Sequence, residues 1–104
     1  MTARQILVLE EAAADLQRGK QFYEANQVGV GEYFFDSLIA DVESLNLYAG
    51  IHGKQFGLYR MLAKRFPYAI YYDITDEFII VIAVLDLRRN PLWIRQQLSR
   101  DNTY

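Results

Sequence analysis

The sequence has no cysteine and a single histidine among its 104 residues. The absence of cysteine excludes disulfide bonds and thiolate metal sites, so a small secreted scaffold held by disulfides does not fit this chain. The one histidine, His52, stands between glycines, and we expect it to face solvent in a loop rather than to act as a general base. We therefore expect neither a metal nor a cofactor.

Long hydrophobic runs are missing as well. The apolar run at residues 6–9 ends at two glutamates, far short of the roughly 20 apolar residues that cross a bilayer or of the apolar core of a signal peptide. We expect a cytoplasmic protein that makes no membrane contact.

Signatures of the common enzyme classes are absent too. The sequence has no phosphate-binding glycine loop, no paired histidines around a glutamate and no nucleophile elbow. We interpret Asp73, Asp76 and Glu77 as solvated acids in or beside a turn. The residues alone leave open whether the chain is an enzyme.

Apolar and aromatic residues are plentiful by contrast. Hydrophobic residues make up 52% of the chain and aromatic residues 14%, which is too apolar for a disordered chain. A chain of this length suits one core rather than two. We therefore expect a single domain over residues 1–104.

Charge is distributed unevenly although the net charge is only −2. Residues 1–52 carry three basic and eight acidic groups, whereas residues 53–104 carry eight basic and five acidic groups. Such an asymmetry can mark a basic face for an anionic partner, or it can simply spread solvated charge over one domain.

The first half has the pattern of one strand and two helices. Residues 5–9 are short, apolar and branched, which indicates a strand. Residues 10–25 and 32–48 repeat apolar side chains at helical spacing, and the glycines within residues 26–31 suit a turn between them. These segments predict a helical hairpin with one apolar side.

The second half changes to the period of strands. Residues 58–64 and 68–74 alternate, and Pro67 suits the start of the second strand because proline cannot donate a ladder hydrogen bond. Residues 78–86 are apolar on both faces, which is typical of a strand inside a sheet. Pro91 suits the first turn of a short final helix.

Together these elements predict an α+β domain with an N-terminal strand, a helical hairpin and an antiparallel three-stranded meander. The sheet would have about four strands, with residues 78–86 between residues 5–9 and the hairpin partner, and two helices would cover one of its faces. Leu92, Trp93 and Ile94 would need cover from the sheet or from a partner.

Basic side chains form the clearest candidate site. If the strands of the second half form a meander, Arg60, Arg88 and Arg89 are the arginines best placed to cluster, and guanidinium groups can hold phosphate through two bonds. Asp86 directly precedes them along the chain and can orient one of the guanidinium groups. With Trp93 these are the predicted target-binding residues, and Arg60 and Arg89 are weak candidates for a catalytic role.

The order of elements resembles the RelE/ParE superfamily of toxins from type II toxin-antitoxin modules. Three stretches carry the resemblance: AAADLQRGKQFYE in the first helix, YRMLAKRFPYAIYY across the second and third strands, and IIVIAVLDLRRNP at the end. It covers nearly the whole chain and implies a small toxin neutralised by a cognate antitoxin, whose amphipathic segment wraps exposed apolar surface. Against an acidic antitoxin, the acidic first half would make contact mainly through apolar side chains.

The superfamily contains ribosome-dependent messenger RNA endonucleases of RelE type and ParE-type inhibitors of DNA gyrase. FPYAIYY and VLDLRRNP are more similar to the ParE side, and the resemblance implies a growth-inhibiting toxin that binds a protein target such as gyrase. Arg60 and Arg89 match basic positions of the nuclease pattern, so an endoribonuclease acting on messenger RNA at the ribosome is the alternative. A third interpretation is an inactive homologue that retains only the antitoxin-binding scaffold.

Two residues depart from the family patterns. Ala69 stands where nucleases carry a basic residue of the sheet, and no proton-transfer residue accompanies the arginines. Asp86 replaces the histidine that usually precedes the basic residues and proline on the ParE side. This replacement puts any function of that histidine in question and would soften the local positive charge.

Overall fold

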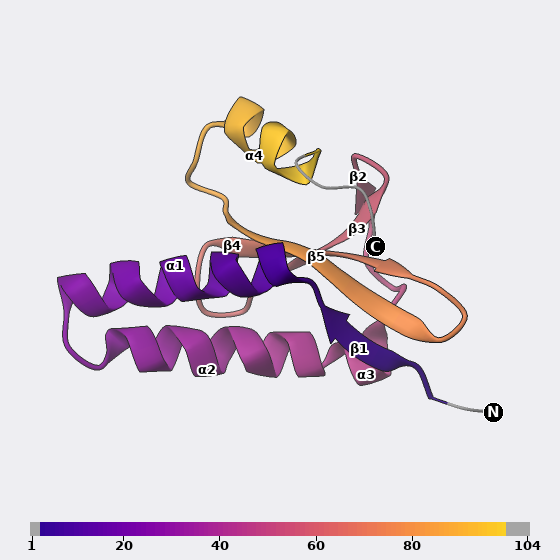
Figure 1. Ribbon diagram of the computed structural model, residues 1–104, viewed down its shortest axis with the longest axis horizontal. Coiled ribbons are helices and arrows are strands. Elements are labelled where there is room, and N and C mark those ends of the chain that lie inside the picture. The colour runs from indigo at the N-terminus through magenta and orange to yellow at the C-terminus, as the bar shows by residue number, and fades with distance from the viewer. Residues whose placement is uncertain (1–2, 100–104) are drawn as a thin grey trace.

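The computed structural model describes residues 3–99, which form one sheet with helices on both of its faces (Figure 1). In chain order the elements are β1 (Gln5–Val8), α1 (Glu10–Asn26), α2 (Val30–Glu43), α3 (Leu45–Tyr48), β2 (Lys54–Gln55), β3 (Leu58–Leu62), β4 (Tyr68–Ile74), β5 (Phe78–Asp86) and α4 (Pro91–Leu98). The strand order is β1-β5-β4-β3-β2, with β1 parallel to β5 and the other neighbours antiparallel. The predicted architecture is confirmed, and the short β2 makes the sheet five-stranded.

Strand β5 lies inside the sheet, as its two apolar faces predict. Residues 79–85 are all buried. Ile79 and Val81 belong to the core under α1 and α2, whereas Ala83 and Leu85 belong to a second core under α4. A strand covered on both faces has no solvated side, and its sequence therefore does not alternate with polar residues.

A β-bulge interrupts the alternation of β5. The register of pairing shifts between Tyr71 and Tyr72 of β4, which leaves Ile82 as an extra residue in β5. Val81 and Val84 therefore contact the same core, although strict alternation would place them on opposite faces.

Helix α4 supplies the second cover of the sheet. Its Ile94 and Leu98 are buried against Ala69 and Tyr71 of β4 and their neighbours in β5. Trp93 is partly buried at the edge of this core. The sheet thus provides most of the cover that the apolar residues of this helix require.

The second predicted helix, residues 32–48, is two helices in the structure. The carboxylate of Glu24 accepts hydrogen bonds from the backbone N–H groups of Gly29 and Gly31, which satisfies donors at the start of α2 and lets it begin earlier than predicted. The Ser44 hydroxyl hydrogen-bonds back to the carbonyl three residues earlier, an interaction that often bends helices, and α3 follows directly.

The strand boundaries agree with the sequence analysis to within two residues. Strand β1 ends at Val8 and β3 at Leu62, whereas β4 and β5 begin and end where predicted. No helix within residues 3–99 is long and apolar enough to cross a membrane.

Candidate functional site

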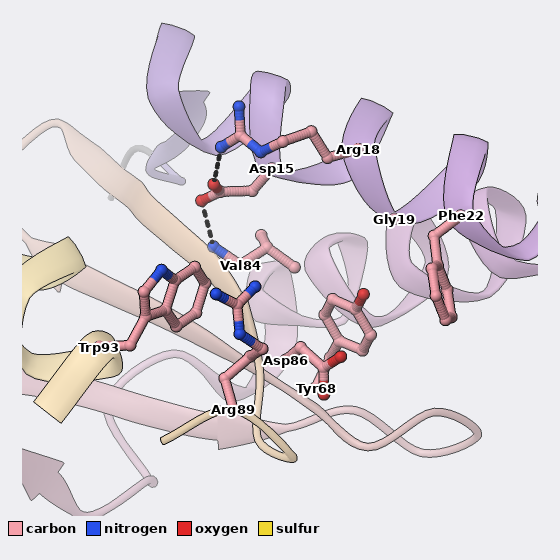
Figure 2. A pocket seen from close by; sticks show the side chains of 9 residues that line it. All are labelled: Asp15, Arg18, Gly19, Phe22, Tyr68, Val84, Asp86, Arg89 and Trp93. Atoms are coloured by element: carbon pink, nitrogen blue, oxygen red, sulfur yellow. Dashed lines mark hydrogen bonds and ion pairs between the residues drawn. The ribbon is translucent and has the colours of Figure 1, made fainter. Parts of the chain in front are cut away.

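A pocket of about 220 Å³ lies between α1, the end of β5 and α4 (Figure 2). It is lined by Asp15, Arg18, Gly19, Phe22, Tyr68, Val84, Asp86, Arg89 and Trp93. Three of the predicted site residues are among them, together with charged and aromatic side chains that the sequence analysis did not single out. We therefore take this pocket as the candidate site.

Asp86 closes β5 and is paired with Arg88, one of the two partners predicted for it. Nε and Nη2 of Arg88 donate hydrogen bonds to the two carboxylate oxygens, at 2.9 and 2.8 Å. Such a two-bond fork fixes the guanidinium group in one orientation. Nη2 also donates to the Tyr23 hydroxyl of α1 at 3.2 Å. Arg88 therefore ties the end of β5 to α1.

Protonation in the pocket follows from burial and from these charges. Burial acts to raise the pKa of Asp86, but the hydrogen bonds from Arg88 and the charges of Arg88 and Arg89 outweigh it, so this pKa lies below its ordinary value. Burial, and next the charge of Asp86, raise the pKa of Tyr68 to about 12. At neutral pH the carboxylate is therefore ionised and the phenol keeps its proton.

The last two residues of the LDLRRNP stretch, Asn90 and Pro91, form the start of helix α4. The Asn90 side chain accepts a hydrogen bond from the Leu92 N–H at 2.7 Å, and Pro91 stands at the start of α4. This start places the guanidinium carbon of Arg89 3.9 Å from the ring centre of Trp93, a cation–π contact. Within residues 3–99 the Arg89 guanidinium has no hydrogen bond or ion pair, so its N–H donors can meet a ligand.

Asp15 is a buried acid of α1 that the sequence analysis missed. One carboxylate oxygen accepts a hydrogen bond from the Val84 backbone N–H at 3.0 Å, and the other lies 2.5 Å from Nη2 of Arg18. Strand β1 ends before this part of β5, so the carboxylate takes the place of a strand acceptor. The available signal was the position of Asp15 between Ala12 and Leu16 on the apolar face of the predicted helix.

Gly19 allows α1 to approach its neighbours beside the pocket. A Cβ at this position would lie 2.5 Å from ring atoms of Phe34 and 3.2 Å from the Tyr68 hydroxyl. Phe34 is fully buried and cannot easily move away. The close packing of α1 on α2 therefore depends on a glycine here.

Arg60 lies apart from the other predicted site residues. It pairs with Tyr71 of β4, which in turn pairs with Ala83 of β5, so two strand spacings separate it from β5. It lines two other pockets, of about 590 and 390 Å³, and neither Arg88 nor Arg89 lines them. The structure does not bring the three arginines together, because Arg88 is drawn toward α1 and Arg60 stays near the opposite edge of the sheet.

His52 does not face solvent freely, contrary to prediction. Its Nδ1 is hydrogen-bonded to the Tyr72 hydroxyl, which also accepts a hydrogen bond from the Gly50 N–H at 2.9 Å. Burial lowers the pKa of His52. The histidine therefore helps to fasten the segment before β2 to the sheet.

Among the described residues, both carboxylates of the pocket are already engaged in hydrogen bonds, whereas the guanidinium of Arg89 is not. Asp15 and Asp86 both already accept hydrogen bonds from the protein, and the Arg89 guanidinium lies over the ring of Trp93. Within the described part of the chain, no group of three or more histidine or acidic side chains is placed to hold a metal ion. Arginine and tryptophan are the residue types that concentrate binding energy in protein interfaces.

Comparisons with known proteins address the family and the fold. The family model described as the ParE toxin of type II toxin-antitoxin system, parDE, matches residues 6–91. The fold is similar to a solved structure titled "Chromosomal ParDE TA system from P. aeruginosa", with a TM-score of 0.75 and 16% sequence identity over 82% of this chain and 97% of that chain. No curated protein matches the sequence significantly.

The family match spans most of the sequence, from β1 to the start of α4. The chain therefore belongs to the ParE toxin family of type II toxin-antitoxin systems, as its motifs indicated.

Proposed function

We propose that this ParE-family toxin arrests growth by binding DNA gyrase through the pocket at Arg89 and Trp93, and that a cognate antitoxin keeps it inactive. The observation that carries the proposal is the Arg89–Trp93 pair, a guanidinium stacked on an aromatic ring in a pocket whose carboxylates are already engaged. Such a pair can anchor a protein partner without any reacting group. The resemblance of the chain to the ParE side of the superfamily favours gyrase as that partner.

The helical hairpin offers a surface for the antitoxin. Phe22, Val28 and Tyr33 are large apolar or aromatic residues of α1, α2 and the turn between them, and they are 51%, 89% and 53% exposed. The same half of the chain is acidic. An amphipathic antitoxin segment would therefore bind here mainly through apolar contacts.

RNA cleavage is less well supported by the same geometry. Arg60 and Arg89 line different pockets, so they are poorly placed to hold one phosphate together. Ala69 is fully buried in the core under α4 and offers no basic group. We therefore place gyrase binding ahead of the endoribonuclease.

A supercoiling assay with purified gyrase and purified toxin tests the proposal. The unmodified toxin should inhibit supercoiling, and Arg89→Ala or Trp93→Ala should raise the concentration for half inhibition at least tenfold. Arg65→Ala removes an exposed arginine outside the pocket and should leave inhibition unchanged. Circular dichroism of each variant controls for folding.

Primer extension on messenger RNA from induced cells distinguishes the alternative. New cleavage sites together with normal supercoiling would favour the endoribonuclease. Induction that neither arrests growth nor inhibits supercoiling would contradict the proposed function and favour an inactive homologue. Restoration of growth by a co-expressed cognate antitoxin is the expected result for the antitoxin part of the proposal.

A further inference from the structure

The turn between β2 and β3 contains a residue that its geometry disfavours. Phe56 has a φ of 56° and Gly57 a φ of 81°, so both central residues are in the left-handed region. Hairpin turns of this kind favour asparagine, aspartate or glycine, because a bulky side chain is strained there. Within residues 3–99, Phe56 is the only residue other than glycine with a positive φ. Such strain persists only where the surrounding structure holds the conformation, and strained residues cluster at functional sites.

The Phe56 ring is presented at the surface beside α4. It is 51% exposed, and the guanidinium carbon of Arg95 lies 5.7 Å from its centre. Figure 1 shows the C-terminal end of α4 close to β2. Helix α4 therefore contributes one member to each of two arginine–aromatic pairs: Trp93 pairs with Arg89 before the helix, and Arg95 pairs with Phe56 of the β2–β3 turn.

Arg60 supplies an unsatisfied donor on the same side of the sheet. Its partner Tyr71 belongs to the core under α4, so the Arg60 side chain extends from that face. Its Nε is buried and has no hydrogen-bond partner within the described residues. The pocket around it is lined in part by Gln55, the neighbour of Phe56 in the chain, and by Leu62, which is 57% exposed. The terminal N–H groups of Arg60 also make no hydrogen bond or ion pair within residues 3–99, and unlike Nε they are not buried, so they can donate to an acceptor on a partner.

We propose that Phe56, Arg60, Leu62 and Arg95 form a second part of the target-binding surface, here called the α4–hairpin surface, which receives an acidic segment of the target protein. The inference rests on the proposed function and names the chemistry of the partner. Carboxylates of the segment accept hydrogen bonds from Arg60 and Arg95, whose guanidinium groups match carboxylate geometry. An apolar side chain of the segment packs on Phe56 and Leu62.

Charge around this surface favours an acidic partner. The two pockets beside Arg60 are also lined by Lys54 and Lys64, and Asp41 is the one acid among their lining residues. The Asp41 carboxylate already accepts a hydrogen bond from the Lys64 backbone N–H at 3.1 Å. The exposed apolar area of Phe56 and Leu62 favours a protein over a nucleic acid, whose affinity comes mainly from phosphate contacts.

Two substitutions test the role of this surface in target binding without destabilising the fold. Phe56→Asn places a residue that suits the left-handed conformation, so the variant should melt at the same or a higher temperature while losing the aromatic ring. Arg95→Glu reverses one charge of the surface. The matched controls are Leu47→Asn in α3 and Arg65→Glu, both at exposed positions that line neither pocket beside Arg60.

Growth arrest and gyrase inhibition are measured in parallel. Both test variants should need at least tenfold more toxin for half-maximal growth arrest, and the same increase for half inhibition of supercoiling, whereas both controls should match the unmodified toxin. Growth arrest reports on the surface whatever the target is, and the supercoiling assay reports whether the target is gyrase. Growth arrest without inhibition of supercoiling would contradict gyrase as the target, but it would not contradict the α4–hairpin surface.

Full growth arrest by folded Phe56→Asn and Arg95→Glu would overturn the surface while leaving the proposed function intact. The same conclusion would follow if the substitutions weakened only antitoxin binding, only self-association, or only retention of a labelled RNA oligonucleotide. These outcomes would assign the surface to a different occupant.

Discussion

Asp86 shows how one residue can organise a site without contributing a reactive group. From the sequence it is a departure from the histidine that the family resemblance implies at this position, and it is expected to soften the local positive charge. In the structure it holds Arg88 in a two-bond fork and thereby fastens the end of β5 to Tyr23 of α1. The free guanidinium of the pocket is then that of Arg89, and the spacing along the chain could not show which arginine would be captured.

We predict that Asp86→Asn lowers stability in a pH-dependent way. The folded-state pKa of Asp86 lies below its ordinary value, so the carboxylate contributes stability above its unfolded-state pKa and loses it as pH falls through the folded value. The Arg88 side chain is 50% exposed, so we expect a loss of only about 1 kcal/mol at pH 7. Urea unfolding at pH 7 and pH 3 should show a smaller acid-induced loss in the variant than in the unmodified protein.

Asp76→Asn, at an exposed position in the turn between β4 and β5, serves as the control for that measurement. Equal acid-induced losses in the Asp86 variant and the unmodified protein would show that the fork does not stabilise the fold.

At the scale of elements, α1 does more than cover the core. Its Asp15 accepts the hydrogen bond of Val84 where β1 no longer flanks β5, and its Gly19 sets the distance to α2. Helical periodicity predicted the apolar face of α1 correctly. It could not assign these roles, because each depends on where another element ends or packs.

We predict that Asp15→Ala destabilises the protein by about 2–3 kcal/mol, because it leaves the buried Val84 N–H without an acceptor. Asp15→Asn keeps a carbonyl oxygen at this position and should cost less. Urea unfolding gives both values, and hydrogen exchange of the Val84 amide should be faster in the alanine variant. Unchanged exchange at Val84 in that variant would contradict the role assigned to the carboxylate.

For Gly19→Ala, helix propensity and packing predict opposite signs. Propensity alone would favour alanine by about 1 kcal/mol. The new Cβ would lie 2.5 Å from the buried Phe34 ring, and overpacking of this kind costs about 1–3 kcal/mol, so we expect a net loss. Thermal unfolding decides the sign, and Gly53→Ala, where an added Cβ meets nothing within 4 Å, is the control.

The fold was more predictable than the site for a physical reason. Helices and strands are specified by local periodicity, and the position of residues 78–86 inside the sheet followed from two apolar faces. The partners of Arg60 and His52 depend on long-range geometry: Arg60 stays near the β3 edge, and His52 is hydrogen-bonded to Tyr72 across a sequence separation of 20 residues. Composition carried no signal for either position.

At the scale of the whole molecule, β5 separates two cores and belongs to both. Helices α1 and α2 cover one face of the sheet and α4 covers the other (Figure 1). A substitution that disrupts the packing of β5 should therefore destabilise both cores together, whereas a substitution in an exposed loop should destabilise neither.

Ile80→Asp tests this arrangement. Ile80 is only 4% exposed, and an unpaired charge at such a position should cost more than about 4 kcal/mol and prevent folding at 37 °C. Ile51→Asp makes the same change at a residue that is 73% exposed and should leave the melting temperature within a few degrees. Solubility and thermal melting are the measurements, and normal behaviour of the Ile80 variant would contradict the central position of β5.

The bulge at Ile82 also has a consequence for how β5 can vary in length. Its two neighbours, Val81 and Ala83, already pair with the adjacent residues Tyr72 and Tyr71 of β4, so Ile82 is an unpaired extra position. Deletion of Ile82 would therefore join the two parts of β5 into a regular strand, and Val84 and Leu85 would keep the layers that they face. A residue can thus be lost at the bulge without a change of register, whereas a loss between paired residues far from it would move the following side chains to the opposite face of the sheet.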